Sequence, residues 1–167
     1  MRILTFSRTF PAYHAKRGEP THFVEKIWKY LYDLPGISWG VGEYQQRHDT
    51  HFGPEQVISV HDFAPKLHTI RQGHRWKAGD MFSPRVWSGK PYNSKQIEIA
   101  PPMEVKRVWA FEIIEGRWRL SNDEIDAVDL NTIAENDGLT LRDFYEWFRW
   151  PKEFSGQIIS WSEKLKY

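Results

Sequence analysis

The sequence predicts an α+β fold in which short antiparallel strands form a small β-barrel with helices around it. Three observations support this prediction. Segments rich in β-branched and aromatic residues recur between Gly and Pro turns, three other segments carry helix signals, and the expected strands are short. Short strands joined by Gly and Pro turns favour a small barrel over a sandwich.

The N-terminal third is expected to hold one strand and one helix. Residues 3–10 (ILTFSRTF) have strand composition and end at a proline. Residues 21–34 have apolar residues at helical spacing, with Thr21 as the cap and a Pro-Gly pair after the last turn. Residues 36–55 are rich in Gly, His and Gln, so a long and partly irregular connection is expected there. Residues 57–63 are expected to form a short strand or turn.

The pattern becomes that of β-structure from residue 80 onward. Strands are expected at 80–87, 94–100 and 104–114, separated by Ser-Gly-Lys-Pro and Pro-Pro turns. A closing strand is expected at 156–162. These segments supply most of the expected sheet.

Two helices are expected between the last two strands. The first, at 121–136, has Ser121 or Asn122 as its cap and acidic residues in its first turn, which the helix dipole favours. The second, at 141–148, follows Thr140 as its cap. Helices inserted among antiparallel strands are typical of the α+β class.

Composition restricts the kinds of chemistry available. The chain has 167 residues, within the usual size of one domain, and 16% of them are aromatic, including nine Trp. It has no Cys, which excludes disulfides, thiolate metal sites and Cys nucleophiles. No signal-peptide pattern and no long apolar run occur, so we expect a cytoplasmic protein that does not bind membranes.

Charge is unevenly distributed, although the net charge is only +1. Residues 64–107 hold nine Lys and Arg against three Asp and Glu, whereas residues 112–146 hold three against ten. A basic region with interleaved aromatic residues is typical of nucleic-acid binding. Ordinary solvated surface gives the same pattern, so both interpretations stay open.

Other motifs give weaker signals. His48 and His51 have a spacing that can bind a metal, but no paired metal motif occurs, so we expect no metal and no cofactor. Carboxylates within 123–137 are expected to be helix-surface charges rather than a catalytic pair. Residues 88–90 (Ser-Gly-Lys) lack the rest of a phosphate-binding loop and are expected to form a turn.

The segment 66–80 (KLHTIRQGHRWKAGD) contains the strongest candidate site. Lys66, Thr69 and Arg71 occur at K-x-x-T-x-R spacing, and in extended chain Thr69 and Arg71 share a face. A lysine near a threonine hydroxyl can lose its proton, act as a base and activate that hydroxyl. The alternative is a solvated basic turn.

The order of these segments resembles the ASCH family, a branch of the PUA-like superfamily. The resemblance covers roughly residues 57 to 162 and rests on KLHTIR, RWKAGD, RVWSGKPY and IAENDGLTLRDFYEWF. Residues 1–56 are similar to an extension found in uncharacterised bacterial and phage members. We therefore expect an extension with one helix at 1–56, packed on an ASCH domain at 57–167.

The resemblance implies a PUA-like β-barrel with a cleft that binds RNA, DNA or a modified nucleoside. Small members of the superfamily are amidohydrolases that remove acyl groups from N4-acylated cytidine. Their catalytic residues correspond to Lys66, Thr69 and a carboxylate, which is either Asp137 or Glu135. Two positions differ from the family pattern, since Ala-Pro stands where Gly often precedes the lysine and Asp137 stands where Glu is expected.

The first functional hypothesis is therefore a module that binds RNA or a nucleotide in a basic cleft. The expected ligand-binding residues are Arg71, Arg75, Trp76, Lys77, Trp87 and Lys90. The alternatives are an amidohydrolase acting on N4-acylcytidine-type nucleosides and a phage-type module that binds another protein. The sequence leaves the oligomeric state open.

Overall fold

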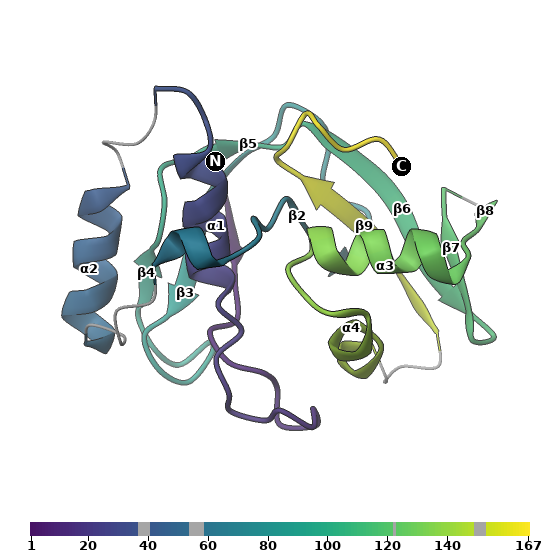
Figure 1. Cartoon of the computed structure of the whole chain (residues 1–167), viewed down its shortest axis with the longest axis horizontal. Coiled ribbons are helices and arrows are strands. Elements are labelled where there is room, and N and C mark those ends of the chain that lie inside the picture. Colours follow the sequence, from purple (N-terminus) through teal and green to yellow (C-terminus); the bar gives the residue numbers. More distant parts are fainter. Residues whose placement is uncertain (37–40, 54–58, 122, 149–152) are drawn as a thin grey trace.

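A computed structural model describes residues 1–36, 41–53, 59–121, 123–148 and 153–167. These residues form a mixed α+β fold with two β-sheets and four α-helices. Figure 1 shows how these elements are arranged. The α+β class is therefore as predicted. Neither sheet closes on itself within the described residues, so the fold is seen as two open sheets.

The first sheet is built around β3 (Met81–Trp87). β1 (Arg2–Thr5) pairs with β3 in parallel, whereas β4 (Gln96–Glu98) and β5 (Met103–Glu104) pair with it antiparallel. The first strand of the chain thus pairs with a strand that lies about eighty residues later. The N-terminal segment is an integral part of this sheet.

The second sheet is antiparallel throughout, in the order β2-β9-β6-β7-β8. Its strands are β2 (His68–Gln72), β9 (Phe154–Ser160), β6 (Arg107–Ile114), β7 (Arg117–Leu120) and β8 (Asp123–Glu124). The basic segment that carries the candidate site is thus an edge strand paired with the last strand of the chain.

The helices lie beside the two sheets. They are α1 (Phe23–Tyr32), α2 (Gly42–Phe52), α3 (Ala127–Asn136) and α4 (Leu141–Trp147), with a short 3₁₀ turn, η1 (Val60–Asp62). Figure 1 shows α1 and α2 beside β3 and β4, and α3 and α4 beside the sheet that contains β6 and β9. The helices therefore flank both sheets.

One hydrophobic core joins the two sheets. Trp161, just after β9, packs edge-on against Phe6 at 5.8 Å between ring centroids and in a tilted arrangement against Phe82 of β3 at 5.9 Å. The cluster also takes in buried residues of α1, such as Ile27, and of β9, such as Ile158. Burial of this apolar surface is the main stabilising term that holds the sheets together.

Most of the expected helices form, with shifted ends. α1 is present, but its N-cap is His22 in the left-handed conformation, while the hydroxyl of Thr21 accepts a hydrogen bond from the amide of Phe23. α4 is capped by Thr140 as expected, since its hydroxyl accepts from the amide of Asp143. The expected cap is therefore correct for α4 and one residue too early for α1.

Two expectations about the helices differ from the structure. α2 forms where an irregular connection was expected. Most of its polar residues are exposed, and the helix is anchored through His48, which is buried and packs edge-on against Trp28. The helix expected from residue 121 begins later, with Asp126 as its cap, because the preceding residues form β8. The expected boundary between residues 56 and 57 lies outside the described residues.

Candidate functional site

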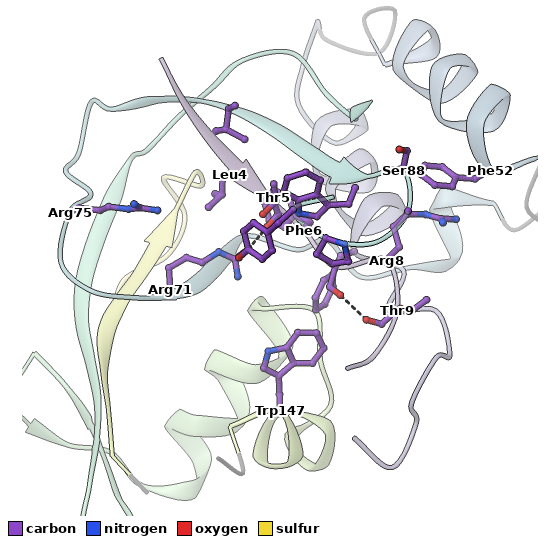
Figure 2. A pocket seen from close by; sticks show the side chains of 17 residues that line it. Leu4, Thr5, Phe6, Arg8, Thr9, Phe52, Arg71, Arg75, Ser88 and Trp147 are labelled. Carbon is purple, nitrogen blue, oxygen red and sulfur yellow. Dashed lines mark hydrogen bonds between the residues drawn. The ribbon is translucent and has the colours of Figure 1, made fainter. Parts of the chain in front are cut away.

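A pocket of about 540 Å³ lies where residues of both sheets meet (Figure 2). Its wall combines the end of β1 and the following residues to Thr9, the end of β2, and the loop after β3. Side chains from helices α1, α2 and α4 complete it: Phe23, Phe52 and Trp147. Pockets of this size and aromatic content are typical of small-molecule sites.

Three arginines line the pocket, and its described lining includes no carboxylate. Arg71, on β2, donates a hydrogen bond through Nη2 to the backbone carbonyl of Thr5, which ties the two sheets together (Figure 2). Its guanidinium carbon lies 5.7 Å from the ring centroid of Phe6. Arg71 is thus held in a fixed position at the pocket wall.

The other two arginines differ in their surroundings. The guanidinium carbon of Arg8 lies 3.5 Å from the ring centroid of Phe52 in α2, a cation–π contact. The side chain of Arg75 is exposed, and no ion pair is found for it among the described residues. Arg75 is therefore available to an anionic ligand at little desolvation cost.

Aromatic rings line two parts of the pocket. Trp147 of α4 packs against Phe23 of α1 at 5.7 Å between ring centroids. On another part, Trp87 at the end of β3 packs against Tyr92 at 5.4 Å. Flat rings beside guanidinium groups can hold a nucleobase by stacking.

A buried ion pair lies next to this pocket. The Nζ atom of Lys66 lies 2.6 Å from Oδ1 of Asp137 and also donates to the backbone carbonyl of Asp137. The same Nζ lies 4.0 Å from the ring centroid of Phe23, whose ring lines the pocket. The side chain of Lys66 is fully enclosed.

The backbone around Lys66 is held by three elements. Its amide donates to the carbonyl of Lys26 in α1 at 3.0 Å, and its carbonyl accepts from the indole of Trp161 at 3.1 Å. The next amide, of Leu67, donates to the carbonyl of Asn136 at the end of α3 at 2.8 Å. These bonds fix the lysine between α1 and α3.

Burial dominates the electrostatics of the pair. It lowers the pKa of Lys66 to about 8, against the opposing effect of the Asp137 carboxylate. Burial also raises the pKa of Asp137, although the nearby cations of Lys66 and Arg71 act in the opposite direction. Each group is thus closer to its neutral form than it would be in water.

The position of Asp137 depends on the glycine that follows it. Asp137 is the C-cap of α3, and Gly138 adopts a φ of +82°, the left-handed conformation that ends many helices. A Cβ atom at Gly138 would lie 3.1 Å from Cδ of Lys26 and 3.6 Å from Cβ of Lys66. The Asp-Gly pair therefore turns the chain while α1 and the lysine pack against it.

The structure distinguishes between the two candidate carboxylates. Glu135 is exposed on α3 and accepts a hydrogen bond from Asn131, whereas Asp137 contacts Lys66. Thr69 is buried in β2 and shares the strand face of Arg71 by alternation. Lys66, Thr69 and Asp137 are not among the residues that line the pocket.

The expected ligand-binding residues fall into two groups. Arg71, Arg75 and Trp87 line the pocket. Trp76 is buried, packs edge-on against Phe82 at 6.1 Å and does not line the pocket. Lys77 and Lys90 are exposed and also lie outside the lining, although Gly89 and Pro91 belong to it.

Several lining residues were missed by sequence reasoning. Arg8 and Phe6 lie in a segment whose composition predicts a strand, and Phe23 lies in one whose spacing predicts a helix. Phe52 and Trp147 lie in helices far from the basic segment in sequence. Only the N-terminal Arg8 carried a signal, as a cation within an otherwise apolar and hydroxyl-rich segment.

A second pocket, of about 570 Å³, lies between α3, β8 and the C-terminal residues. Its lining mixes carboxylates, including Asp123 and Asp129, with Lys164 and Lys166. Among the described residues, no group of three or more His, Asp or Glu could hold a metal ion. Nor does any described helix have the length and apolarity needed to cross a membrane.

Comparison with family models, with curated proteins and with solved structures finds no match for this chain.

Proposed function

We propose that the chain binds RNA or a nucleotide in the pocket between the two sheets. The observation that carries this proposal is the pocket wall, which holds Arg8, Arg71 and Arg75 beside aromatic rings and includes no carboxylate among its described residues. Guanidinium groups bind phosphate oxygens, often in bidentate geometry, and aromatic rings stack on bases of any sequence.

The likeness to the PUA-like superfamily agrees with this proposal. If the chain has the PUA-like fold, the two open sheets are the two parts of the barrel, and the pocket is the ligand cleft of that barrel. The basic segment at 66–80 contributes Arg71 and Arg75 to that cleft. The ordered succession of motifs in the sequence and the character of the pocket support the same ligand class.

A titration of single-stranded RNA tests the proposal. The probe is a short fluorescein-labelled RNA of mixed sequence, followed by anisotropy at about 50 mM and about 200 mM salt. Arg75→Gln is expected to weaken binding and reduce the slope of log K against log salt by about one. Arg117→Gln is the matched control, since Arg117 is exposed on β7 and pairs with Glu124.

Two results would reject the proposal. The first is that the wild-type protein shows salt-dependent binding neither to the RNA nor to cytidine 5′-monophosphate, which is used as a second probe. Alternatively, Arg117→Gln would weaken binding as much as Arg75→Gln, which would indicate a diffuse surface effect rather than this pocket.

A second candidate function is amide hydrolysis on an N4-acylated cytidine. The observation that favours it is the contact of Lys66 with Asp137 at 2.6 Å, together with the lowering of the pKa of Lys66 to about 8. An amine that is partly neutral near pH 8 can act as a general base. The lysine of the ion pair contacts the ring of Phe23, and that ring lines the pocket.

In this reaction Thr69 Oγ1 attacks the amide carbonyl carbon while the neutral amine of Lys66 accepts the hydroxyl proton. Asp137, in its acid form, gives its proton to the departing amine as the carbon–nitrogen bond breaks. Arg71 stabilises the oxyanion. Water then hydrolyses the acyl ester on Thr69 and releases the carboxylic acid.

Turnover of N4-acetylcytidine tests this second candidate. Thr69→Ala is expected to lower kcat/KM by at least about a hundredfold, whereas Thr69→Ser keeps a hydroxyl nucleophile and retains measurable activity. Turnover that Thr69→Ala leaves unchanged would reject the role of Thr69. No turnover by the wild-type protein would leave ligand binding as the function.

A further inference from the structure

One exposed aromatic residue at the pocket has no structural explanation within the described fold. Tyr92 lines the pocket in the loop between β3 and β4, yet 88% of its surface is exposed. Its φ is +64°, in the left-handed region that is unfavourable for a non-glycine residue. A large ring in a strained backbone position gains little stability from contacts of its own.

The loop that holds Tyr92 is well fixed. The amide of Ser88 donates to the carbonyl of Lys95 at 2.8 Å, and the amide of Asn93 donates to the carbonyl of Lys90 at 3.1 Å. The hydroxyl of Ser94 accepts from the amide of Gly89 at 3.0 Å and donates to the carbonyl of Lys90 at 2.9 Å. The strained position is therefore imposed by the loop, as at many binding sites.

Among the residues that the structure describes, one aromatic ring packs against Tyr92. The ring of Trp87 lies 5.4 Å away at an interplanar angle of 50°, and both rings belong to the pocket lining. The remaining surface of Tyr92 faces solvent. An exposed ring beside a pocket is a platform on which a further flat group can stack.

The same loop carries two cations. Lys90 and Lys95 are exposed, and neither ammonium has an ion pair or hydrogen bond among the described residues. They lie on the loop that presents Tyr92, so an anionic group next to a base stacked there can reach them. A base joined to a phosphate is the chemistry that fits this combination.

We propose that the loop from Ser88 to Lys95 is a second stacking site, and that the ligand is a single strand of nucleic acid rather than a free nucleoside. This inference rests on the proposed function of the pocket. One base occupies the pocket, the adjacent base stacks on Tyr92, and the phosphate beside it contacts Lys90 or Lys95.

A competition experiment against the labelled RNA tests this inference. The competitors are cytidine 5′-monophosphate, the dinucleotide CpC and the deoxy counterpart of CpC. The wild-type protein is expected to bind a dinucleotide more tightly than the mononucleotide. Tyr92→Gly is expected to weaken dinucleotide binding by roughly tenfold or more and to weaken mononucleotide binding by a much smaller factor, so that the preference for the dinucleotide is lost. Tyr92→Phe retains the ring and is expected to keep the tight binding.

The choice of glycine separates binding from folding. Glycine adopts a φ of +64° without strain, so Tyr92→Gly should fold at least as stably as the wild type. Tyr145→Ala is the control for loss of an exposed aromatic residue outside the pocket, since Tyr145 is 42% exposed on α4. It is expected to leave both affinities unchanged.

The outcomes separate this inference from the proposed function. Equal affinity for mononucleotide and dinucleotides, with Tyr92→Gly without effect, would overturn the second stacking site and leave the pocket as the binding site. Absence of binding by all probes would overturn both. A preference of the wild type for RNA over DNA dinucleotides that depends on Tyr92 would support the inference and identify RNA as the ligand.

Discussion

Lys66 and Asp137 form a buried ion pair, with 2.6 Å between Nζ and Oδ1, although the two residues are 71 positions apart in the sequence. The pair joins the start of β2 to the end of α3 beside the pocket. Taking two charges out of water is unfavourable, and their attraction compensates only when both partners are present. This relationship gives the first two predictions.

Lys66→Met is expected to lower the free energy of unfolding by about 3 kcal/mol or more, because it leaves the Asp137 carboxyl buried without its partner. Chemical denaturation measures this change. Lys29→Met is the matched control, since Lys29 forms an ion pair with Asp33 near the surface of α1. It should change stability by less than about 1 kcal/mol. Equal effects of the two substitutions would contradict the account.

The lowered pKa of Lys66 predicts a stability increase at alkaline pH. The unfolded lysine has a pKa of 10.5, whereas the folded one has a pKa of about 8. Between these values the unfolded chain binds more protons than the folded chain, so the free energy of unfolding rises with pH. From pH 7.5 to 9.5, the wild type should gain about 2 kcal/mol relative to Lys66→Met. Parallel pH profiles for the two proteins would contradict the lowered pKa.

A side chain at Gly156 in β9 is expected to clash with the neighbouring strand β2, which carries Arg71. A Cβ atom there would lie 2.2 Å from the backbone carbonyl of Arg71 and 2.8 Å from the ring of Phe154. Gly156→Ala should therefore lower the free energy of unfolding by about 3 kcal/mol, at the upper end for overpacking. Gly89→Ala is the control, since its Cβ would meet Ser94 at an ordinary 3.5 Å. A tolerated Gly156→Ala would show that β2 and β9 lie farther apart.

The cap of α3 predicts a loss of stability without loss of binding. The Asp126 carboxylate accepts hydrogen bonds from the amides of Val128 at 2.8 Å and Asp129 at 2.9 Å. Asp126→Ala should lower the free energy of unfolding by about 1 kcal/mol. RNA affinity should stay unchanged at temperatures where the variant is folded, because Asp126 does not line the arginine-rich pocket. A parallel loss of affinity would mean that α3 contributes to the ligand site.

The sequence allowed the lysine and the carboxylate of the buried pair to be proposed, but it predicted their burial and their contacts only in part. The K-x-x-T-x-R spacing drew attention to Lys66, and the resemblance to the ASCH family implied either Asp137 or Glu135 as its carboxylate partner. The structure brings Lys66 and Asp137 into contact. Glu135, two residues earlier, points to solvent because the helical turn separates the two carboxylates. A sequence cannot resolve that difference when the end of a helix is uncertain by two residues.

The aromatic residues were the least predictable part of the site. Trp76 and Trp87 have the same residue type and the same basic neighbourhood in sequence, yet one is buried and the other lines the pocket. Large rings serve both core packing and ligand stacking, so composition does not separate these roles. Arg8 and Trp147 were missed because long-range packing, rather than local pattern, brings them to the pocket that Arg71 lines.

The most direct test of the central claim is the location of the bound nucleotide, since the protein has two pockets of similar volume among its described residues. We would record backbone amide NMR spectra of the labelled protein while adding cytidine 5′-monophosphate. The account predicts chemical-shift changes at Arg8, Arg71 and Ser88, with none at Thr132 or Asn136 of the second pocket. Changes confined to Thr132 and Asn136, or no changes at saturating nucleotide, would contradict it.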